Sequence, residues 1–267
     1  MQNEDSWRIA HSFDFRKTMK ILAITNQKGG VGKTTTAVNL SACLAALQRR
    51  VLLIDLDPQG NATTGVGVFK KEALPTVYQL LIGKARFEEV KITTQFGFDL
   101  MPANRELSGA EVELVELSER EMRLKKSLKN IEALYDFVII DCPPALNMLT
   151  VNGLVAAQAV LIPMQCEYYA LEGLSDLVET LRKIKKLNKD LEIEGLLRTM
   201  FNPQGVLNQQ VSQELEKYFP NKIYQSIIPR NVRLAEAPSY GKPILFYDKS
   251  SRGARAYMDL ACEMLGK

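Results

Sequence analysis

Cysteine and histidine are scarce in this sequence. The 267 residues include one histidine, His11, and four widely separated cysteines, Cys43, Cys142, Cys166 and Cys262. The cysteines form no CxxC pair, so we expect reduced thiols in structural positions, and neither a disulfide framework nor a zinc site. His11 precedes the first predicted strand and is therefore a poor candidate for catalysis.

The chain also lacks long apolar runs and a strong charge of either sign. No apolar run approaches the ~18 residues that a membrane span needs. Residues 1–18 carry three acidic residues and no apolar core, unlike a secretory signal. We therefore expect a cytoplasmic protein without stable membrane association. The formal net charge of +3 leaves the partner open, although a weak positive bias on one face is enough for salt-sensitive, sequence-independent DNA contact.

The residues that are present suit one α/β domain. A chain that is 46% hydrophobic and 24% charged has ample apolar material for a core. We expect residues 1–18 to form a flexible extension and residues 19–267 to form a single domain. Short apolar runs alternate with helical patterns, which predicts a doubly wound, mostly parallel β-sheet flanked by helices. The predicted strands are 21–24, 50–54, 98–101, 137–140, 159–163 and 193–200, and the predicted helices include 37–44, 78–82, 106–134, 171–184 and 252–265.

A glycine-rich loop joins the first predicted strand to the first helix. It reads Lys28-Gly29-Gly30-Val31-Gly32-Lys33-Thr34-Thr35. Its glycines let backbone N–H groups converge at the positive end of the helix, and Lys33 adds an ammonium, so a nucleotide triphosphate is the expected ligand. The usual GxxxxGK[ST] pattern fails at Gln27, and the loop holds a second lysine, Lys28. That lysine either crowds its own nucleotide or points to a nucleotide held by a second copy of the chain.

Three aspartates follow predicted buried strands. Asp55 and Asp57 end the strand 50–54, and Asp141 ends the strand 137–140 in a Walker B arrangement. Ligands gather at the carboxyl ends of parallel strands, so we expect these carboxylates beside the loop, where a triphosphate needs Mg2+ and a positioned water. The alternative for Asp57 is a simple strand-ending turn at an Asp-Pro pair. Asn202, after the strand 193–200, is a candidate adenine contact.

Residues 26–36 resemble the deviant Walker A box of the partition ATPases, the superfamily of the ParA/Soj proteins, the division-site ATPase MinD and the nitrogenase iron protein. Residues 57–63, 165–174 and 228–239 are most similar to the chromosomal ParA/Soj branch. The resemblance runs from Lys20 nearly to the C-terminus. It implies a P-loop ATPase of the deviant Walker A type that uses ATP and Mg2+.

The resemblance also implies roles for single residues. Lys28 corresponds to the signature lysine that crosses a dimer interface to the partner's ATP, and Gly29 to a point of close approach between subunits. Lys33 is implied to contact the β- and γ-phosphates, and Asp57 to orient the attacking water. The implied Mg2+ ligands are Thr34, Asp57 and Asp141, and the implied adenine loop includes Pro229 and Asn231.

In this family, ATP-bound homodimers bind double-stranded DNA without sequence preference. The resemblance implies slow hydrolysis that a ParB-like centromere-binding protein stimulates, and a nucleoid-associated protein that positions chromosome or plasmid origins. Arg233 stands where a DNA-binding arginine is expected, and Arg230 is a second candidate. A further expected basic position holds Gln204, so we expect DNA binding to be weaker or spread over other residues. A basic cluster in and after the helix 171–184 is more often a solubilising surface than a DNA-binding face; it consists of Arg182, Lys183, Lys185, Lys186 and Lys189.

Three alternatives stay open from the sequence. A nucleotide-gated regulatory switch with little turnover shares every motif and differs only in its kinetics. A MinD-like positioning ATPase needs a basic amphipathic C-terminal helix, whereas Asp259 and Glu263 lie near the end of this sequence. A reductase like the nitrogenase iron protein needs two cysteines that face the dimer axis, and Cys142 and Cys166 are the candidates.

Overall fold

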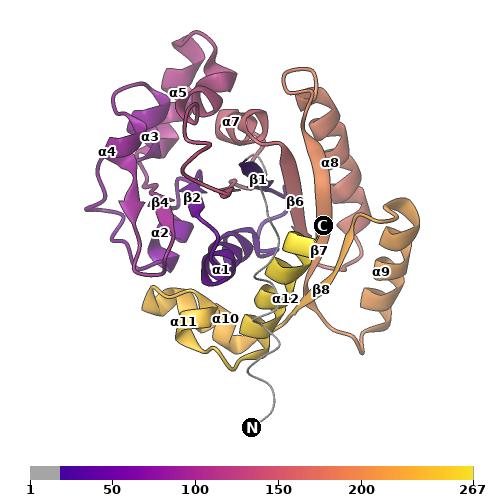
Figure 1. Ribbon diagram of the computed structural model, residues 1–267. Coiled ribbons are helices and arrows are strands. Elements are labelled where there is room, and N and C mark those ends of the chain that lie inside the picture. Colours follow the sequence, from indigo (N-terminus) through magenta and orange to yellow (C-terminus); the bar gives the residue numbers. More distant parts are fainter. Residues whose placement is uncertain (1–18, 267) are drawn as a thin grey trace.

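The computed structural model describes residues 19–266, so the flexible extension predicted for residues 1–18 lies outside the described chain. Eight strands form one sheet in the order β3-β4-β2-β5-β1-β6-β7-β8, which runs through the middle of the fold (Figure 1). Neighbouring strands are parallel except for β3 and β4. The strands are β1 Lys20–Ile24, β2 Val51–Asp55, β3 Ile92–Thr93, β4 Asp99–Met101, β5 Phe137–Asp141, β6 Ala159–Met164, β7 Glu192–Phe201 and β8 Ile223–Pro229.

Helices fill most of the connections between the strands. They are α1 Lys33–Ala46, α2 Asn61–Gly65, α3 Val77–Leu81, α4 Phe87–Val90, α5 Leu107–Glu116, α6 Arg123–Ser127, α7 Met148–Ala156, α8 Ala170–Ile184, α9 Val206–Tyr218, α10 Val232–Glu236, α11 Ile244–Tyr247 and α12 Arg252–Gly266. The six predicted strands are present, as are the helices predicted for 37–44, 78–82, 171–184 and 252–265. The sequence analysis did not predict α7, α9 and β8.

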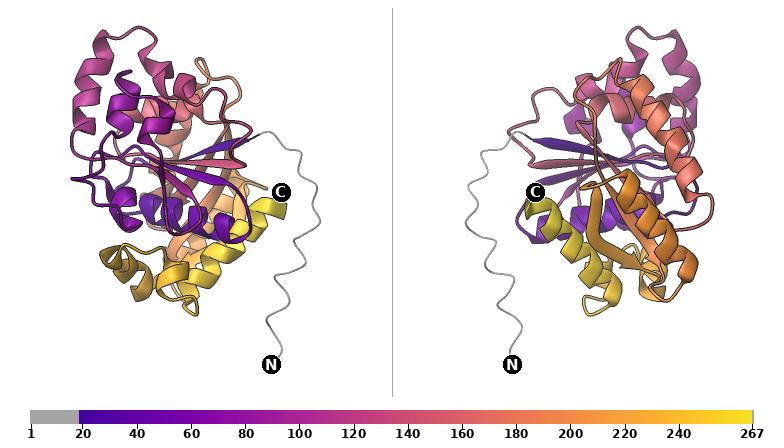
Figure 2. Two further views of the ribbon diagram at one scale, coloured as in Figure 1. Left: turned by 60° about the vertical axis from the view of Figure 1, so that its left-hand side comes forward. Right: turned by 90° about the vertical axis from the view of Figure 1, so that its right-hand side faces the viewer.

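The sheet carries a hydrophobic core on each face because its central strands are apolar throughout. All five residues of β2 are buried, and successive side chains point to opposite faces. Leu52 and Ile54 join the core under α3, α5, α7 and α8. Val51 and Leu53 join the core under α1 and α12. Figure 2 shows the two helical layers on either side of the sheet, and this arrangement confirms the predicted doubly wound α/β fold.

The single helix predicted for residues 106–134 is wrong. The structure divides this region into α5, a 3-10 turn at Arg120–Met122 and α6. The backbone leaves α5 at Leu117, which is extended, and turns at Glu119, whose φ of 52° lies in the left-handed region. Apolar spacing alone did not reveal this break, because the apolar residues on both sides of it pack into the same core.

A buried side chain of α7 stabilises the break between α5 and α6. The Asn152 side chain accepts a hydrogen bond from the Leu124 backbone amide at 3.1 Å and donates one to the Arg120 carbonyl at 2.8 Å. Buried backbone groups must be paired, and an unbroken helix pairs them internally. Here the amide of Asn152 replaces those helical partners and lets the chain turn across α7.

The outer edge of the sheet at β8 is covered by the last helix. The Glu263 carboxylate of α12 accepts hydrogen bonds from the backbone amides of Gln225 and Ser226, both at 2.8 Å, and from the Ser226 hydroxyl at 2.7 Å. The apolar face of α12 packs on α1 and β8. This helix is therefore an integral part of the domain.

Candidate nucleotide-binding site

The glycine-rich loop connects β1 to α1 as predicted. Gly30 and Gly32 have φ values of 74° and 89°, a left-handed conformation that glycine adopts without strain. Gly32 is also the N-cap of α1, and no side chain of the described residues caps this helix end. The first backbone N–H groups of α1 and the positive end of its dipole therefore face the loop, which is the arrangement that binds phosphate.

Lys33 lies under the loop. It is 7% exposed, and its Nζ donates a hydrogen bond to the Lys28 carbonyl at 2.9 Å. Burial lowers the pKa of Lys33, while the negative charges of Asp141 and Asp57 oppose that shift. Lys33, which is predicted to contact the phosphates, therefore lies close enough to Asp57 and Asp141 for their charges to interact.

Asp55 and Asp141 lie side by side on adjacent strands, in register at the carboxyl ends of β2 and β5. Both are fully buried. Burial, followed by the charge of Asp55, raises the pKa of Asp141 well above its ordinary value, and the nearby Thr34 hydroxyl acts in the opposite direction. No hydrogen bond of ordinary geometry reaches either carboxylate oxygen of Asp141 within the described residues. A buried carboxylate without partners needs a cation or a proton.

Asp55 has a structural role that the sequence analysis did not predict. Its Oδ2 accepts hydrogen bonds from the Thr63 backbone amide at 2.8 Å and the Thr63 hydroxyl at 2.7 Å. The same hydroxyl accepts one from the Ala103 amide at 2.9 Å. Burial raises the pKa of Asp55 to about 6, although these hydrogen bonds oppose the shift. Asp55 therefore ties the segment after β2 to the segment after β4.

Asp57 is half-buried beside this pair. Its backbone amide donates to Asp55 Oδ1 at 3.2 Å, and its own Oδ1 accepts from the Gln59 amide at 2.9 Å. The strand-ending turn considered as an alternative is therefore present. The turn also brings the Asp57 carboxylate close enough to Lys33 to affect the pKa of Lys33. Asp57 therefore both forms a strand-ending turn and lies in the candidate site.

Two cavities meet at Thr35, on the first turn of α1. The first, about 290 Å³, is lined by Thr34, Thr35, Asn39, Asn61 and Lys242 among others. The second, about 210 Å³, is lined by Gly32, Thr35, Met200, Pro229, Arg230 and Asn231 among others. Pro229 and Asn231, predicted to contact adenine, thus lie beside the loop. Arg230, predicted to contact DNA, lies in the same cavity wall.

Asn202 does not line the second cavity with Pro229 and Asn231, the other residues predicted to contact adenine. It is exposed and lies outside the lining of the second cavity. Its Oδ1 accepts a hydrogen bond from the Gln204 amide at 3.1 Å, and its own backbone amide donates to Asn208 Oδ1 at 2.8 Å. The structure therefore shows Asn202 as part of the turn between β7 and α9.

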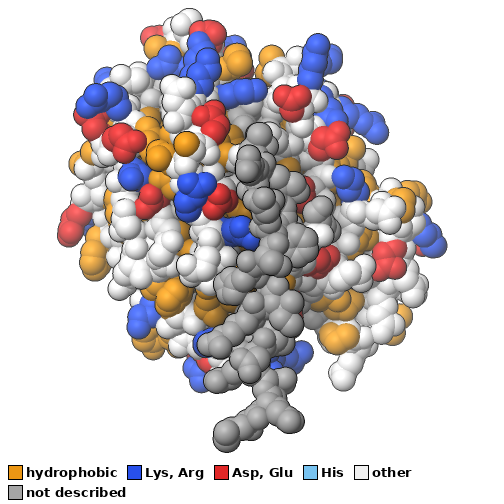
Figure 3. Space-filling model, viewed as in Figure 1, with side chains coloured by type: hydrophobic (Ala, Val, Ile, Leu, Met, Phe, Trp, Pro, Cys, Tyr) orange, Lys and Arg blue, Asp and Glu red, His pale blue; other side chains and the backbone are white. Residues whose placement is uncertain are grey.

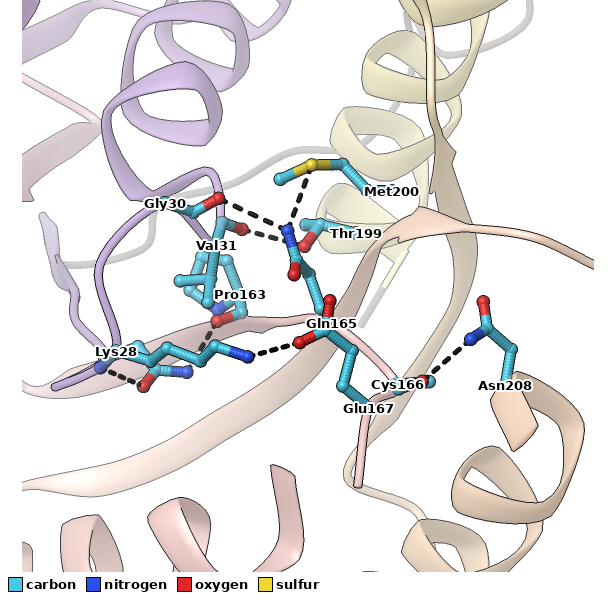
Figure 4. A network of polar contacts seen from close by, with 11 residues as sticks. Lys28, Gly30, Val31, Pro163, Gln165, Cys166, Glu167, Thr199, Met200 and Asn208 are labelled. Atoms are coloured by element: carbon cyan, nitrogen blue, oxygen red, sulfur yellow. Dashed lines mark hydrogen bonds and ion pairs between the residues drawn. The ribbon is translucent and has the colours of Figure 1, made fainter. Parts of the chain in front are cut away.

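Residues from β6 and β7 hold the glycine-rich loop from the other side. The Thr199 hydroxyl donates to the Val31 carbonyl at 2.7 Å, and Gln165 Nε2 donates to the Gly30 carbonyl at 3.3 Å (Figure 4). Gln165 Nε2 also lies 3.0 Å from the sulfur of Met200. The sequence analysis missed these contacts, although each of the three residues stands at or just after the carboxyl end of a buried strand, where parallel sheets gather ligands.

The Lys28 side chain pairs with an acidic residue that follows β6. Its Nζ lies 2.5 Å from Glu167 Oε2, and the two side chains are 44% and 47% exposed. Apart from Gly29 itself and its two chain neighbours, no described residue has a heavy atom within 4 Å of a Cβ placed at Gly29. The loop therefore presents an open surface beside Lys28.

Arg233 lies on α10, which begins beside the second cavity at Asn231. Its Nη1 is 2.9 Å from Glu236 Oε2 and its Nε is 3.6 Å from Asp248 Oδ2. The predicted DNA-binding arginine is therefore exposed but already paired with two carboxylates. Figure 3 shows acidic side chains among the basic ones on the visible face of the molecule, so that face does not carry charge of a single sign.

Two structural observations bear on the alternatives from the sequence. Cys142 and Cys166 are 1% and 2% exposed, so neither faces outward as a cluster shared between two subunits requires. Among the described residues, no helix is both long enough and apolar enough to cross a membrane.

Comparisons with known proteins identify the family. Residues 19–193 match a family model described as an AAA domain. The sequence is 56% identical over 247 residues to the sporulation initiation inhibitor protein Soj of Bacillus subtilis, covering 92% of this chain and 98% of that one. It is 49% identical over 248 residues to the chromosome partitioning protein ParA of Myxococcus xanthus, covering 92% and 88%. The chain belongs to the ParA/Soj family. This finding confirms the resemblance predicted from the glycine-rich loop and the three longer segments.

The fold of this ParA/Soj member is shared with a solved structure that has a different name. A cobyrinic acid a,c-diamide synthase from Mycobacterium smegmatis, with bound ATP analog and magnesium, superimposes with a TM-score of 0.82. The two chains are 36% identical, and the match covers 91% of this chain and 93% of that one. The two partitioning proteins are more similar to this chain in sequence than this synthase is.

Proposed function

We propose that this chain is a slow, Mg2+-dependent ATPase that positions chromosome or plasmid origins. The observation that carries the proposal is the cluster of Lys33, Asp57 and Asp141 beneath a phosphate-binding loop. The family relationship to chromosome partitioning proteins and the ATP analog with magnesium in the solved neighbour support it.

The residues present fit ATP with Mg2+. Asp141 offers buried carboxylate oxygens with no hydrogen bond of ordinary geometry to another described residue, and Thr34 offers a hydroxyl beside it, which together suit a hard cation. Asp57 is the third proposed ligand, direct or through the water that it orients. When bound, the cation neutralises charge on the phosphates, while Lys33 and the N–H groups of the loop Lys28–Thr35 hold the triphosphate in position. Pro229 and Asn231 are proposed to flank the adenine, and Asn202 stays a more distant candidate.

We further propose that ATP joins two subunits face to face. Lys28 then reaches the phosphates of the partner's ATP, and the open surface at Gly29 permits the close approach. The dimer binds double-stranded DNA without sequence preference through Arg233 and Arg230, and a ParB-like protein accelerates hydrolysis and release. A member with this activity is cytoplasmic and nucleoid-associated.

Sizing by light scattering tests the dimer directly. We expect a monomer without nucleotide and a dimer with a non-hydrolysable ATP analog and Mg2+, with retention on DNA only in the second state. A chain that stays monomeric at saturating analog would refute the proposal. Turnover in the presence of a ParB-like protein then separates the proposed slow ATPase from the alternative of a nucleotide-gated switch, which binds ATP equally well but hydrolyses little of it.

A MinD-like membrane role is disfavoured by the packing of α12. The apolar side chains of this helix, including Tyr257 and Leu260, are buried on α1 and the sheet, so they are not available to insert into a lipid surface. We therefore propose no stable membrane association.

A further inference from the structure

The segment Gln165–Glu167, which directly follows β6, contacts three other parts of the molecule. Gln165 donates to the Gly30 carbonyl of the glycine-rich loop at 3.3 Å. The Cys166 carbonyl accepts a hydrogen bond from Asn208 Nδ2 of α9 at 2.8 Å. Glu167 forms the 2.5 Å ion pair with Lys28. Figure 4 shows these contacts converging between the loop and the ends of β6 and β7.

These contacts constrain the chain directly before Glu167. The backbone on its N-terminal side is held by Asn208, and Gln165 is held between the loop and Met200. Met200 has a φ of 48°, a left-handed conformation that is uncommon for residues other than glycine and persists where its surroundings hold it. Glu167 therefore extends toward Lys28 from a constrained backbone.

We propose that Glu167 is a positioning residue that retains the Lys28 ammonium within its own subunit. The inference rests on the proposed function, in which Lys28 must reach the triphosphate of a second copy of this chain. A triphosphate and a carboxylate are both anions, so bringing the partner's phosphates to Lys28 also brings them toward Glu167. Negative charges that are brought close together repel one another. The intrasubunit ion pair and the intersubunit contact thus compete, and Glu167 sets the ATP concentration at which subunits join.

The size of this effect is bounded by the exposure of the pair. Because both side chains are about half exposed, water and salt screen their attraction, and such a pair changes an equilibrium constant by at most about fivefold. The screening also predicts that the effect shrinks as ionic strength rises. Glu167 therefore adjusts the threshold for dimer formation and leaves the nucleotide site itself intact.

The test compares Glu167→Gln with Glu172→Gln, which removes the same charge from an exposed position in the first turn of α8. Dimer formation is measured by light scattering against the concentration of non-hydrolysable ATP analog. We expect Glu167→Gln to form dimers at a lower analog concentration than the wild type in ~50 mM salt, by a factor of up to about fivefold, with a smaller difference in ~500 mM salt. Glu172→Gln should match the wild type.

The outcomes separate the two proposals. A wild type that never forms dimers refutes the proposed function. A wild type that forms dimers, with a Glu167→Gln curve that is unchanged or shifted to higher analog concentration, refutes the role of Glu167 alone.

A second measurement does not depend on dimers. The rate at which an amine-reactive reagent modifies Lys28 in the nucleotide-free protein, read by mass spectrometry, should rise in Glu167→Gln and stay at the wild-type value in Glu172→Gln. An equal rate in all three proteins would show that Glu167 does not retain the Lys28 ammonium, and would overturn the inference.

Discussion

Two charged regions of this molecule differ in how their charges are paired. At the carboxyl ends of β2 and β5, Asp55 and Asp141 are fully buried, and Asp141 has no hydrogen-bonding partner of ordinary geometry in the described chain. On α10, Arg233 is exposed and pairs with Glu236 and Asp248. The first region leaves a buried charge unsatisfied, whereas the second satisfies an exposed charge internally.

This difference indicates how strongly each region binds its proposed ligand. Desolvated charges without partners interact strongly with a cation or phosphate because little water competes. An exposed arginine must exchange its carboxylates for a DNA phosphate, and the net gain is small. We therefore expect changes at the buried cluster to abolish steps of the nucleotide cycle, and changes on α10 to adjust DNA affinity.

The largest effect is expected from Lys33→Ala. This substitution removes a buried ammonium whose charge-assisted hydrogen bonds to phosphate have no replacement, so nucleotide affinity should fall by about 100-fold or more. Isothermal titration with ATP and Mg2+ measures the change, with the exposed Lys189→Ala as the control. ATP affinity that survives in Lys33→Ala would mean that the loop is not the phosphate site.

Asp57→Ala probes the same cluster at the hydrolysis step. The variant should bind ATP and accumulate as a dimer, because the residue proposed to orient the attacking water is missing. Turnover should fall by about 100-fold, as measured by phosphate release. Gln59→Ala keeps the backbone amide that Asp57 caps and serves as the control. Wild-type turnover in Asp57→Ala would remove this residue from the mechanism.

The buried pair of aspartates predicts an unusual pH dependence of stability without nucleotide. Burial raises the pKa of Asp55 to about 6, above the ordinary value of about 3.9 that applies to the unfolded chain. Between these values the folded chain binds more protons than the unfolded chain, so this group stabilises the fold as pH falls from 7 toward 5. Its contribution is at most about 3 kcal/mol.

Chemical denaturation at pH 7.5, 6 and 5 measures this effect. Asp55→Asn should show a flatter pH profile than the wild type, whereas the exposed Asp190→Asn should keep the wild-type slope. If Asp55→Asn and the wild type had parallel profiles, the buried carboxylate would not be the titrating group.

The smallest effects are expected on α10. Arg233→Ala should weaken DNA binding by the ATP-bound protein and lower the slope of log affinity against log salt by about 0.9 for each DNA phosphate that the arginine neutralises. Asp248→Asn should strengthen binding, by at most about fivefold, because it releases one of the two carboxylates that hold Arg233. Fluorescence anisotropy over a salt series measures both. Arg86→Ala, which removes an exposed arginine paired with Glu89, should leave DNA affinity unchanged, and the same result for Arg233→Ala would refute its role.

The parts of this molecule that the sequence predicts well are those with local patterns. Buried parallel strands read as continuous apolar runs, and a glycine-rich loop between a strand and a helix specifies its own backbone. The loop, β1, β2, β5 and the aspartates at their ends were predicted for these reasons. The break after Leu117 was not, because its backbone groups are paired by Asn152, a residue on a helix that follows later in the chain.

Pairing between distant residues was the main information that the sequence did not supply. Thr63 holds Asp55, Glu167 holds Lys28, and Asp248 lies beside Arg233. Each contact depends on how two segments pack, and neither partner carries a local signal for the other. Asn202, chosen for its place after a strand, makes its contacts locally instead, with Gln204 and Asn208, in a turn outside the cavity.

The Glu263 carboxylate affects how the edge strand β8 can interact with other copies of the protein. Strand edges with open amides are templates on which a neighbouring chain can continue the sheet. The Glu263 carboxylate accepts hydrogen bonds from the amides of Gln225 and Ser226, so these amides are not open to a strand of a neighbouring copy. While Glu263 holds these two amides, a strand of another copy cannot pair with them, which weakens β8 as a site of strand addition.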